Sequence, residues 1–131
     1  MRVEEYSFVE NSGGAGKYRG GMGLRRVLMP VDHECVFNGA GERFRYQPWG
    51  LFGGLAGGSG RFTIWDADGE RRLDDKPNEV EVVPGTRITV ETPGAGGYGA
   101  PSERAAEALQ IDQKSGKYSA AFIEQHYSTR K

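Results

Sequence analysis

Hydrophobic and polar residues alternate with a period of two along much of residues 2–92, which is the pattern of β-strands that bury one face. Strands of this kind are typical of antiparallel sheets, so we expect an antiparallel, mainly β body. Asp68-Gly69 and Pro84-Gly85 are turn signals that predict two hairpins, one joining 61–65 to 71–73 and one joining 80–83 to 87–91. The expected strands are residues 6–9, 24–29, 35–37, 43–46, 61–65, 71–73, 80–83 and 87–91.

The pattern changes to a helical one after residue 101. Ser102 is the expected N-cap of a helix over residues 103–113, and Ser119 that of a second helix over residues 120–128. Apolar side chains four residues apart in the second helix form a stripe that we interpret as a docking surface. The sequence predicts a single domain over residues 1–131, made of a β body at 2–92, a glycine run at 93–101 and a helical tail at 102–131, with the sheets in a barrel-like or sandwich arrangement.

Glycine is the unusual component of the composition, at 21 of 131 residues. Sixteen of the glycines fall in three runs, at residues 13–23, 50–60 and 94–99, and within the runs they often recur three apart. A polyproline II helix has three residues per turn, so such glycines line one face, where another backbone can approach closely. Aromatic residues and prolines interleave with the glycines, unlike in a flexible linker. We therefore expect ordered, polyproline II-like segments packed side by side.

Charge, hydropathy and cysteine content exclude several classes of protein. Lysine and arginine total 17 against 18 acidic residues, without the basic excess of a nucleic-acid-binding protein. The sequence contains no apolar run of 18 residues, so we expect no membrane span. The single Cys35 has no partner for an internal disulfide, which favours a cytoplasmic location.

Several motifs nearly match known sites. The phosphate-loop pattern around Gly14-Ala15-Gly16-Lys17 lacks its first glycine and the hydroxyl residue after the lysine. Residues 94–99 match a dinucleotide-binding glycine pattern, but Pro101 delays the helix that it requires. His33 and Cys35 are weak zinc-ligand candidates, since a structural zinc site needs four ligands, and only a site shared with another chain stays open. We predict no catalytic residue and no cofactor site in this chain.

The glycine runs together resemble the hydantoinase B/oxoprolinase family. Residues 11–23, Asn-Ser-Gly-Gly-Ala-Gly-Lys-Tyr-Arg-Gly-Gly-Met-Gly, are similar to its signature D-S-G-G-x-G-x-x-R-G-G-x-G, with Asn11 in place of the usual aspartate. Residues 48–54 and 93–101 resemble two later blocks, the second together with Arg104. Asp112 and residues 116–119 fit the segment that usually closes the family's sequences. Members are typically several hundred residues long, so the resemblance covers their C-terminal region alone.

The resemblance implies a fold of β-sheets in a barrel-like arrangement with short polyproline-type helices. It also implies a small structural or site-completing subunit of an ATP-dependent ketone carboxylase, acetophenone carboxylase in particular, which includes a small subunit of about this size. Because Met1 lies close before the first signature, we expect a separately encoded subunit. Large hydantoinase A-type and hydantoinase B-type subunits are the implied partners, with ATP and a divalent metal such as magnesium held by them.

Two alternatives to the carboxylase stay open, a subunit of an ATP-dependent amidohydrolase acting on hydantoin, oxoproline or a lactam, and a non-enzymatic binding module. Residues of the glycine runs and the aromatic residues among them are the expected interface or structural positions. These are Gly13, Gly14, Gly16, Tyr18, Arg19, Gly20, Gly21, Trp49, Gly53, Gly54, Gly96, Gly97 and Tyr98.

Overall fold

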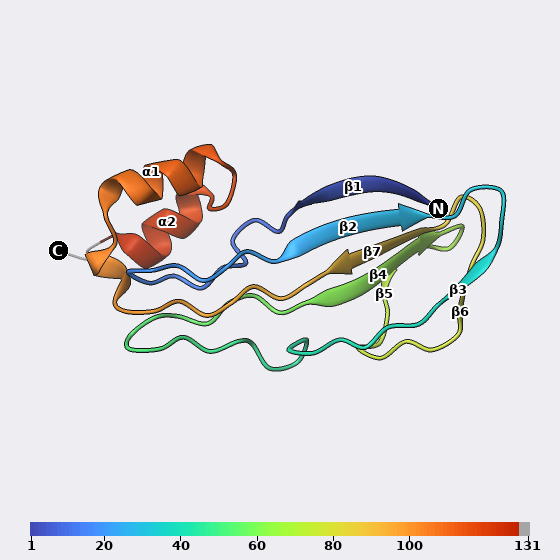
Figure 1. The fold of residues 1–131 in the computed structure, drawn as a ribbon, viewed down its shortest axis with the longest axis horizontal. Helices are drawn as coiled ribbons and strands as arrows, with labels where there is room; N and C mark the ends of the chain where they lie inside the picture. The colour runs from blue at the N-terminus through green and yellow to red at the C-terminus, as the bar shows by residue number, and fades with distance from the viewer. Residues whose placement is uncertain (129–131) are drawn as a thin grey trace.

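The structure is a computed structural model that describes residues 1–128. Its sheets lie at one end and its helices at the other, and extended glycine-rich segments connect the two (Figure 1). The strands are β1 (Arg2–Phe8), β2 (Leu24–Met29), β3 (Cys35–Phe37), β4 (Arg61–Asp66), β5 (Gly69–Arg72), β6 (Val80–Val82) and β7 (Arg87–Glu91). The helices are a 3₁₀ turn η1 (Pro101–Glu103), α1 (Ala106–Lys114) and α2 (Ala120–Tyr127).

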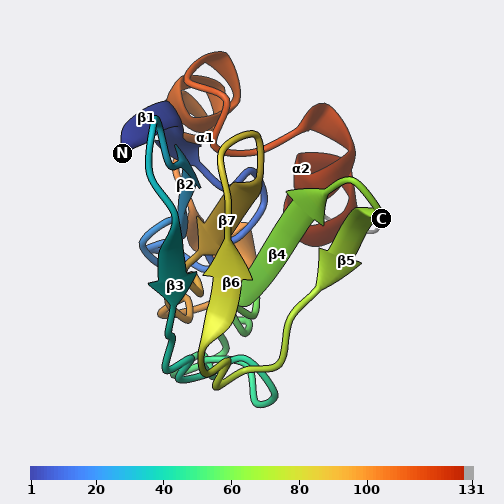
Figure 2. The ribbon, with the colours of Figure 1, turned by 90° about the vertical axis from the view of Figure 1, so that its right-hand side faces the viewer.

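The strands form two antiparallel sheets. The larger sheet has the order β1-β2-β7-β4-β5, and the smaller one pairs β3 with β6. The smaller sheet lies across one face of the larger (Figure 2), and a core of Ile64, Val82 and Ile88 fills the space between them. The expected mainly β, antiparallel fold is confirmed, and residues 1–128 form an open, sandwich-like pair of sheets without barrel closure.

Much of the strand pattern follows from the alternation. The strands β2, β3 and β7 have the predicted bounds, and the predicted hairpin of β4 and β5 is present. Its two-residue turn is Ala67-Asp68, one position earlier than expected, because the Asp68 N–H donates to Asp66 Oδ1 at 2.9 Å and Gly69 takes the positive φ of 101°. The return strand therefore begins at Gly69.

Two strand predictions are wrong, and a third has different bounds, because β1 is Arg2–Phe8 where residues 6–9 were expected. Residues 80–83 and 87–91 form no hairpin, since β6 pairs with β3 while β7 lies between β2 and β4. A tight turn, with Gly85 at φ 91° and a hydrogen bond from the Thr86 N–H to the Val83 carbonyl, passes the chain from one sheet to the other. Residues 43–46 are not a strand, because Arg43 has a φ of 58° and the buried Phe44 turns in against Phe62, with ring centroids 4.8 Å apart.

The helical tail is also partly as expected. The N-cap role of Ser119 is confirmed, since its Oγ accepts the Phe122 N–H at 3.2 Å. The predicted N-cap Ser102 is wrong, because α1 begins only after Arg104, whose extended backbone directs its side chain to the carboxylate of Asp112. No helix within residues 1–128 is both long and apolar enough to cross a membrane. Residues 129–131 of the predicted tail lie outside the described part, and the single-domain boundary stays a prediction.

Candidate interface on the glycine bundle

The three glycine runs lie side by side, and we call residues 13–23, 50–60 and 94–99 the glycine bundle. Backbone hydrogen bonds connect every pair of runs. The Gly14 N–H donates to the Ala95 carbonyl at 2.8 Å, and the Gly97 N–H donates to the Leu55 carbonyl at 2.9 Å. The Gly58 N–H donates at 2.7 Å to the carbonyl of Ser12, which directly precedes the first run. The runs thus satisfy one another's backbone groups without forming a sheet.

Close backbone approach explains why so many of these positions are glycine. A Cβ atom at Gly14, Gly54 or Gly97 would lie within 3.0 Å of a carbonyl group of another run, closer than real Cβ atoms approach. A Cβ at Gly16, Gly20 or Gly96 would likewise lie within 3.0 Å of backbone atoms of a neighbouring segment, whereas at Gly13 it would meet the Gly20 carbonyl of the same run. Two of the glycines expected to be structural differ: Gly21 has open space where its Cβ would lie, and Gly53 has a positive φ of 92°. The side-by-side packing agrees with the spacing, whereas polyproline II geometry itself stays a prediction.

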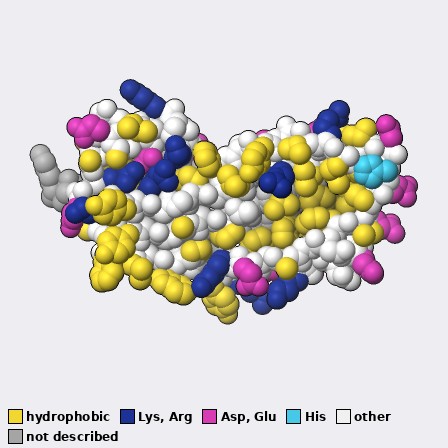
Figure 3. All heavy atoms as spheres, in the orientation of Figure 1, with side chains coloured by type: hydrophobic (Ala, Val, Ile, Leu, Met, Phe, Trp, Pro, Cys, Tyr) yellow, Lys and Arg dark blue, Asp and Glu magenta, His cyan; other side chains and the backbone are white. Residues whose placement is uncertain are grey.

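Large apolar side chains are exposed on this bundle. Tyr18 and Trp49 are each 62% exposed, and Phe52 is 77% exposed. Tyr98 contacts both neighbouring rings, with centroids 6.3 Å from Tyr18 and 5.1 Å from Phe52. Leu51 is also half exposed. We call Tyr18, Trp49, Leu51, Phe52 and Tyr98 the aromatic patch, and hydrophobic side chains are visible along this end of the molecule in Figure 3. Such clusters mark surfaces that bind another protein.

Leu51 and Phe52 were not among the interface positions expected from the sequence. Both lie in the second glycine run, where Phe52 has a φ of 49° that points to a tight local turn. Two adjacent large apolar residues between the glycines at 50 and 53–54 were the available signal. The Leu51 backbone is bonded to the third run, its N–H donating to Gly97 and its carbonyl accepting from Gly99, so the turn holds the patch in place.

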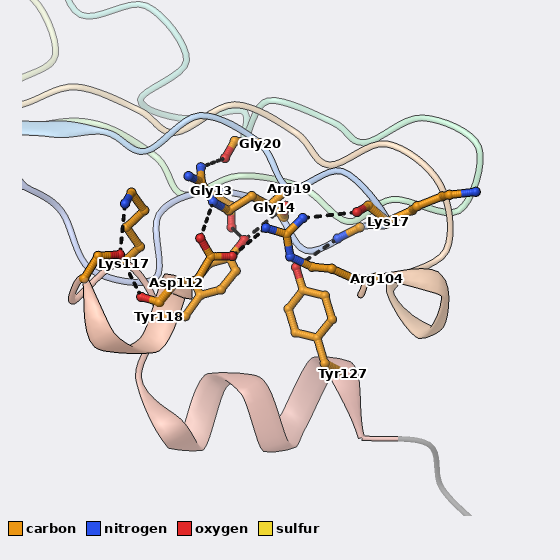
Figure 4. Close-up of polar contacts among 12 residues, drawn as sticks. Gly13, Gly14, Lys17, Arg19, Gly20, Arg104, Asp112, Lys117, Tyr118 and Tyr127 are labelled. Atoms are coloured by element: carbon orange, nitrogen blue, oxygen red, sulfur yellow. Dashed lines mark hydrogen bonds and ion pairs between the residues drawn. The ribbon is translucent and has the colours of Figure 1, made fainter. Parts of the chain in front are cut away.

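Arg19 lies in a different cluster, one that fixes the helical tail to the first glycine run (Figure 4). The buried Asp112 carboxylate accepts from Arg19 Nε at 2.9 Å through Oδ1, and from Arg104 Nη2 at 2.6 Å through Oδ2. The same guanidinium groups donate to carbonyls of the run, Arg19 to Gly20 at 3.0 Å and Arg104 to Lys17 at 3.1 Å. We call these three side chains the Asp112 cluster, and its contacts are structural.

Two buried tyrosines extend this attachment. The Tyr118 O–H donates to the Gly13 carbonyl at 2.7 Å, and the Gly16 N–H donates to the Tyr127 hydroxyl at 3.2 Å. Burial, followed by the hydrogen bond with Tyr127, raises the pKa of Tyr118 far above its usual value, so the hydroxyl stays a donor. The apolar stripe of α2 therefore docks on the glycine bundle of its own chain, around Ala15.

Asn11 has a specific role at the position where the resemblance predicts aspartate. Its backbone φ is 62°, a conformation that asparagine tolerates better than most residues. Its amide nitrogen donates to Ser119 Oγ at 3.1 Å, and its amide oxygen accepts the Ser119 N–H at 2.9 Å. The side chain thereby joins the start of the first glycine run to the N-terminus of α2.

A second buried carboxylate, which was not expected from the sequence, lies on the outer face of the larger sheet. Glu91 on β7 accepts from Arg25 Nε of β2 at 2.6 Å and from Arg61 of β4. Burial raises the pKa of Glu91, but the two guanidinium groups outweigh it and lower the pKa below its usual value. Alternation places all three side chains on one face, since Glu91 is paired with both arginines across the strands.

The residues considered for chemistry do not come together. The exposed His33 places Nδ1 2.7 Å from the Val31 carbonyl oxygen, whereas Cys35 packs against the core between the sheets. Within residues 1–128 there is no group of three or more His, Cys, Asp or Glu side chains arranged for a metal. Lys17 pairs with Glu103 at 3.0 Å, a contact that raises the pKa of the lysine. These residues do not fit a phosphate or metal site within the described chain.

Known proteins with the same arrangement are much longer. The chain is 35% identical to an uncharacterized protein of Methanocaldococcus jannaschii, and the match covers 99% of this chain and 23% of that protein. It is 33% identical to the caprolactamase β subunit of Pseudomonas jessenii, and the match covers 87% of this chain and 20% of that relative. This chain thus spans less than a quarter of the length of either.

Two solved structures share the fold with a TM-score of 0.72 and cover 95% of this chain. One is the ATP-dependent caprolactamase of Pseudomonas jessenii, 30% identical, of which the chain covers 22%. The other is nucleotide-free acetone carboxylase, 22% identical, of which it covers 21% and which shows the fold alone. The family model of hydantoinase B/oxoprolinase matches residues 1–101. The chain therefore belongs to the hydantoinase B/oxoprolinase family.

Proposed function

We propose that this chain is a small structural subunit, or structural portion, of a multi-subunit ATP-dependent enzyme, and that it is not catalytic by itself. The exposed aromatic patch carries the proposal, because the glycine bundle holds it rigidly and no group suited to catalysis lies among its residues. The patch contacts a large hydantoinase A-type or hydantoinase B-type subunit. Those subunits hold ATP and a divalent metal such as magnesium.

The first candidate reaction is a ketone carboxylation in the cytoplasm. Acetophenone, bicarbonate and ATP would give benzoylacetate, as the family resemblance implies. The shared fold with acetone carboxylase supports this candidate. All the chemistry of the reaction lies in the partner subunits, and this chain contributes the surface on which they assemble.

The second candidate is an ATP-dependent amidohydrolase that opens a hydantoin, 5-oxoproline or lactam ring. Its support is the higher sequence identity among the two solved structures, 30% to caprolactamase against 22% to acetone carboxylase. A third candidate, a free-standing binding module, requires a stable monomer that works without large partners. The exposure of the aromatic patch argues against that monomer.

Purification of the native complex through a tagged copy of this chain tests the proposal. We expect a large hydantoinase B-type chain to co-purify and to be identified by mass spectrometry. ATP consumption by the complex, measured with acetophenone and bicarbonate and then with hydantoin, 5-oxoproline and caprolactam, separates the first two candidates. A monomer that co-purifies with no member of the family would refute both.

The role of the aromatic patch is tested by Phe52→Ser, which removes an exposed ring. The matched control is Ile111→Ser, at a 63% exposed position of α1. We expect the Phe52 variant to lose its partners by about tenfold or more, as for an interface anchor, while the control keeps them. Equal retention of partners by both variants would show that the patch lies outside the interface.

A further inference from the structure

The inner face of the larger sheet is only partly covered. Where the smaller sheet lies over β4 and β7, Ile64 and Ile88 are only 1% and 3% exposed. On β1, by contrast, Tyr6 and Phe8 are 61% and 53% exposed. These side chains share the inner face, because Tyr6 is paired with Arg26, which is in turn paired with Val90 next to the core. Figure 3 shows a broad hydrophobic area over this half of the molecule.

The smaller sheet ends next to this uncovered area. In the end view of Figure 2, β3 lies on the side of β1 and β2, while β6 lies in front of β7 and β4. Within residues 1–128, β3 pairs with β6 and with no strand on its other side. Val36 at the centre of β3 is 57% exposed. An edge strand with free N–H and C=O groups is a template for an added strand, and one added here would lie on the β1 and β2 side of the smaller sheet.

A charged group lies in the middle of the uncovered face. Arg26 is exposed on β2, with its guanidinium 4.9 Å from the ring centroid of Tyr6. Within residues 1–128 no carboxylate forms an ion pair with Arg26, whereas Arg25 and Arg61 on the outer face share Glu91. A partner that covered this face without a negative charge would bury the arginine unpaired, which is unfavourable. An element that covered this face would therefore need a carboxylate opposite Arg26.

We propose that an apolar β-strand with a carboxylate side chain completes the sandwich by pairing with the free edge of β3. The strand covers Tyr6 and Phe8 and places its carboxylate against Arg26. It comes from the part of a hydantoinase B-type subunit that has no counterpart in this chain, which is about four-fifths of the two solved structures. The inference rests on the proposed function for its partner, but it concerns a second surface, on the sheets and not on the glycine bundle.

Hydrogen–deuterium exchange on the tagged chain, alone and in the native complex, tests this pairing. We expect amides of residues 35–37 to exchange at least about tenfold more slowly in the complex, because strand pairing adds hydrogen bonds at the edge. Tyr6 and Phe8 also become buried, so a Tyr6→Ser, Phe8→Ser double variant loses partners while Ile111→Ser retains them. Each variant chain is first compared with the original in its thermal unfolding, so that a folding defect is recognised.

Charge variants test the carboxylate. Arg26→Glu should lower the recovered partner by about tenfold or more, while Arg26→Lys changes it by less than about threefold. The control is Lys76→Glu, an exposed charge reversal elsewhere, which should leave recovery unchanged. Equal recovery with Arg26→Glu and Lys76→Glu overturns the carboxylate contact.

The outcomes separate this inference from the proposed function. If a hydantoinase B-type chain co-purifies but residues 35–37 gain no protection, the inference is wrong and the proposed function stands. If no such chain co-purifies, both are wrong. If the isolated chain dimerises with rising concentration and protects the same residues, the occupant is a second copy of this chain, and the inference is again overturned.

Discussion

The glycine bundle and the pair of sheets bury their backbones in opposite ways. In the bundle, three runs approach one another so closely that a Cβ at Gly14, Gly54 or Gly97 would lie within 3.0 Å of a carbonyl group. Between the sheets, Ile64 and Val82 instead fill the space with side chains that are 1% and 2% exposed. The bundle thus depends on the absence of side chains and the sheets on their presence. A larger side chain should therefore lower the unfolding free energy most in the bundle.

Each region is also in contact with one buried carboxylate that lies between two arginines, Asp112 of α1 at the glycine bundle and Glu91 in the larger sheet, but the surroundings differ. Asp112 is bound by Arg19 and Arg104, whose side chains are 23% and 11% exposed. The arginines on Glu91 of the larger sheet are 37% and 52% exposed. Water screens the second cluster more, so charge removal should destabilise the Asp112 cluster more strongly.

The largest effect is expected from Gly54→Val and Gly97→Val in the glycine bundle. Each new side chain would overlap a carbonyl of a neighbouring run, and the loss of unfolding free energy should reach about 3 kcal/mol or more, or cooperative unfolding should disappear. Urea denaturation followed by circular dichroism measures it. Gly21→Val is the control, since open space surrounds that position. Unchanged stability in both test variants would refute the packing of the bundle.

The next largest effect is expected from Asp112→Asn. The variant leaves two partly buried guanidinium groups without their counter-charge, and should lower the unfolding free energy by about 3 kcal/mol. Glu103→Gln is the control, because the Lys17–Glu103 pair is about half exposed and water screens it, so its loss should change stability far less. Similar losses in the two variants would mean that the Asp112 cluster does not fix the helical tail.

The sequence predicted where strands and closely packed glycines lie, but it did not predict how the strands pair. Alternation placed β2, β3 and β7 correctly because each strand buries one face, and glycine spacing indicated the close packing of the runs. Neither signal could predict which strands pair. Residues 80–83 and 87–91 have the same local pattern, and the turn at Gly85 and Thr86 directs them into different sheets.

The clusters show the same limit. Asp112 and Arg104 were recognised as family positions, but the sequence did not predict their contacts with the first glycine run, from Arg19 to Asp112 and from Arg104 to the Lys17 carbonyl, because no local pattern encodes them. The local helix signal instead favoured Ser102 as the N-cap. Exposure of Leu51 and Phe52 likewise depends on how three distant runs pack. Contacts between segments that are distant in the sequence could therefore not be predicted from this sequence alone.

A smaller, pH-dependent effect is expected from Glu91→Gln in the larger sheet. The folded-state pKa of Glu91 lies below its unfolded value of about 4.3, so its ionised form adds stability above that pH and loses it as pH falls through the lowered pKa. At pH 7 the variant should be less stable by about 1–2 kcal/mol, as for hydrogen bonds to charged groups. The difference from the original chain should shrink steadily below about pH 4 in urea titrations. A difference that is constant from pH 7 to pH 3 would contradict the assignment.

The smallest effect is expected from Asn11→Asp, which restores the aspartate of the family pattern. A carboxylate can still accept the Ser119 N–H, and the Ser119 hydroxyl can turn to donate to it in place of the lost amide donor. A negative charge is also favourable at the N-terminus of α2. The change should therefore stay within about 0.5 kcal/mol, while Asn11→Ala loses both contacts and costs about 1–2 kcal/mol. A large loss with Asn11→Asp would show that the amide donor itself fixes α2 to the glycine bundle, and that the position depends on more than an acceptor.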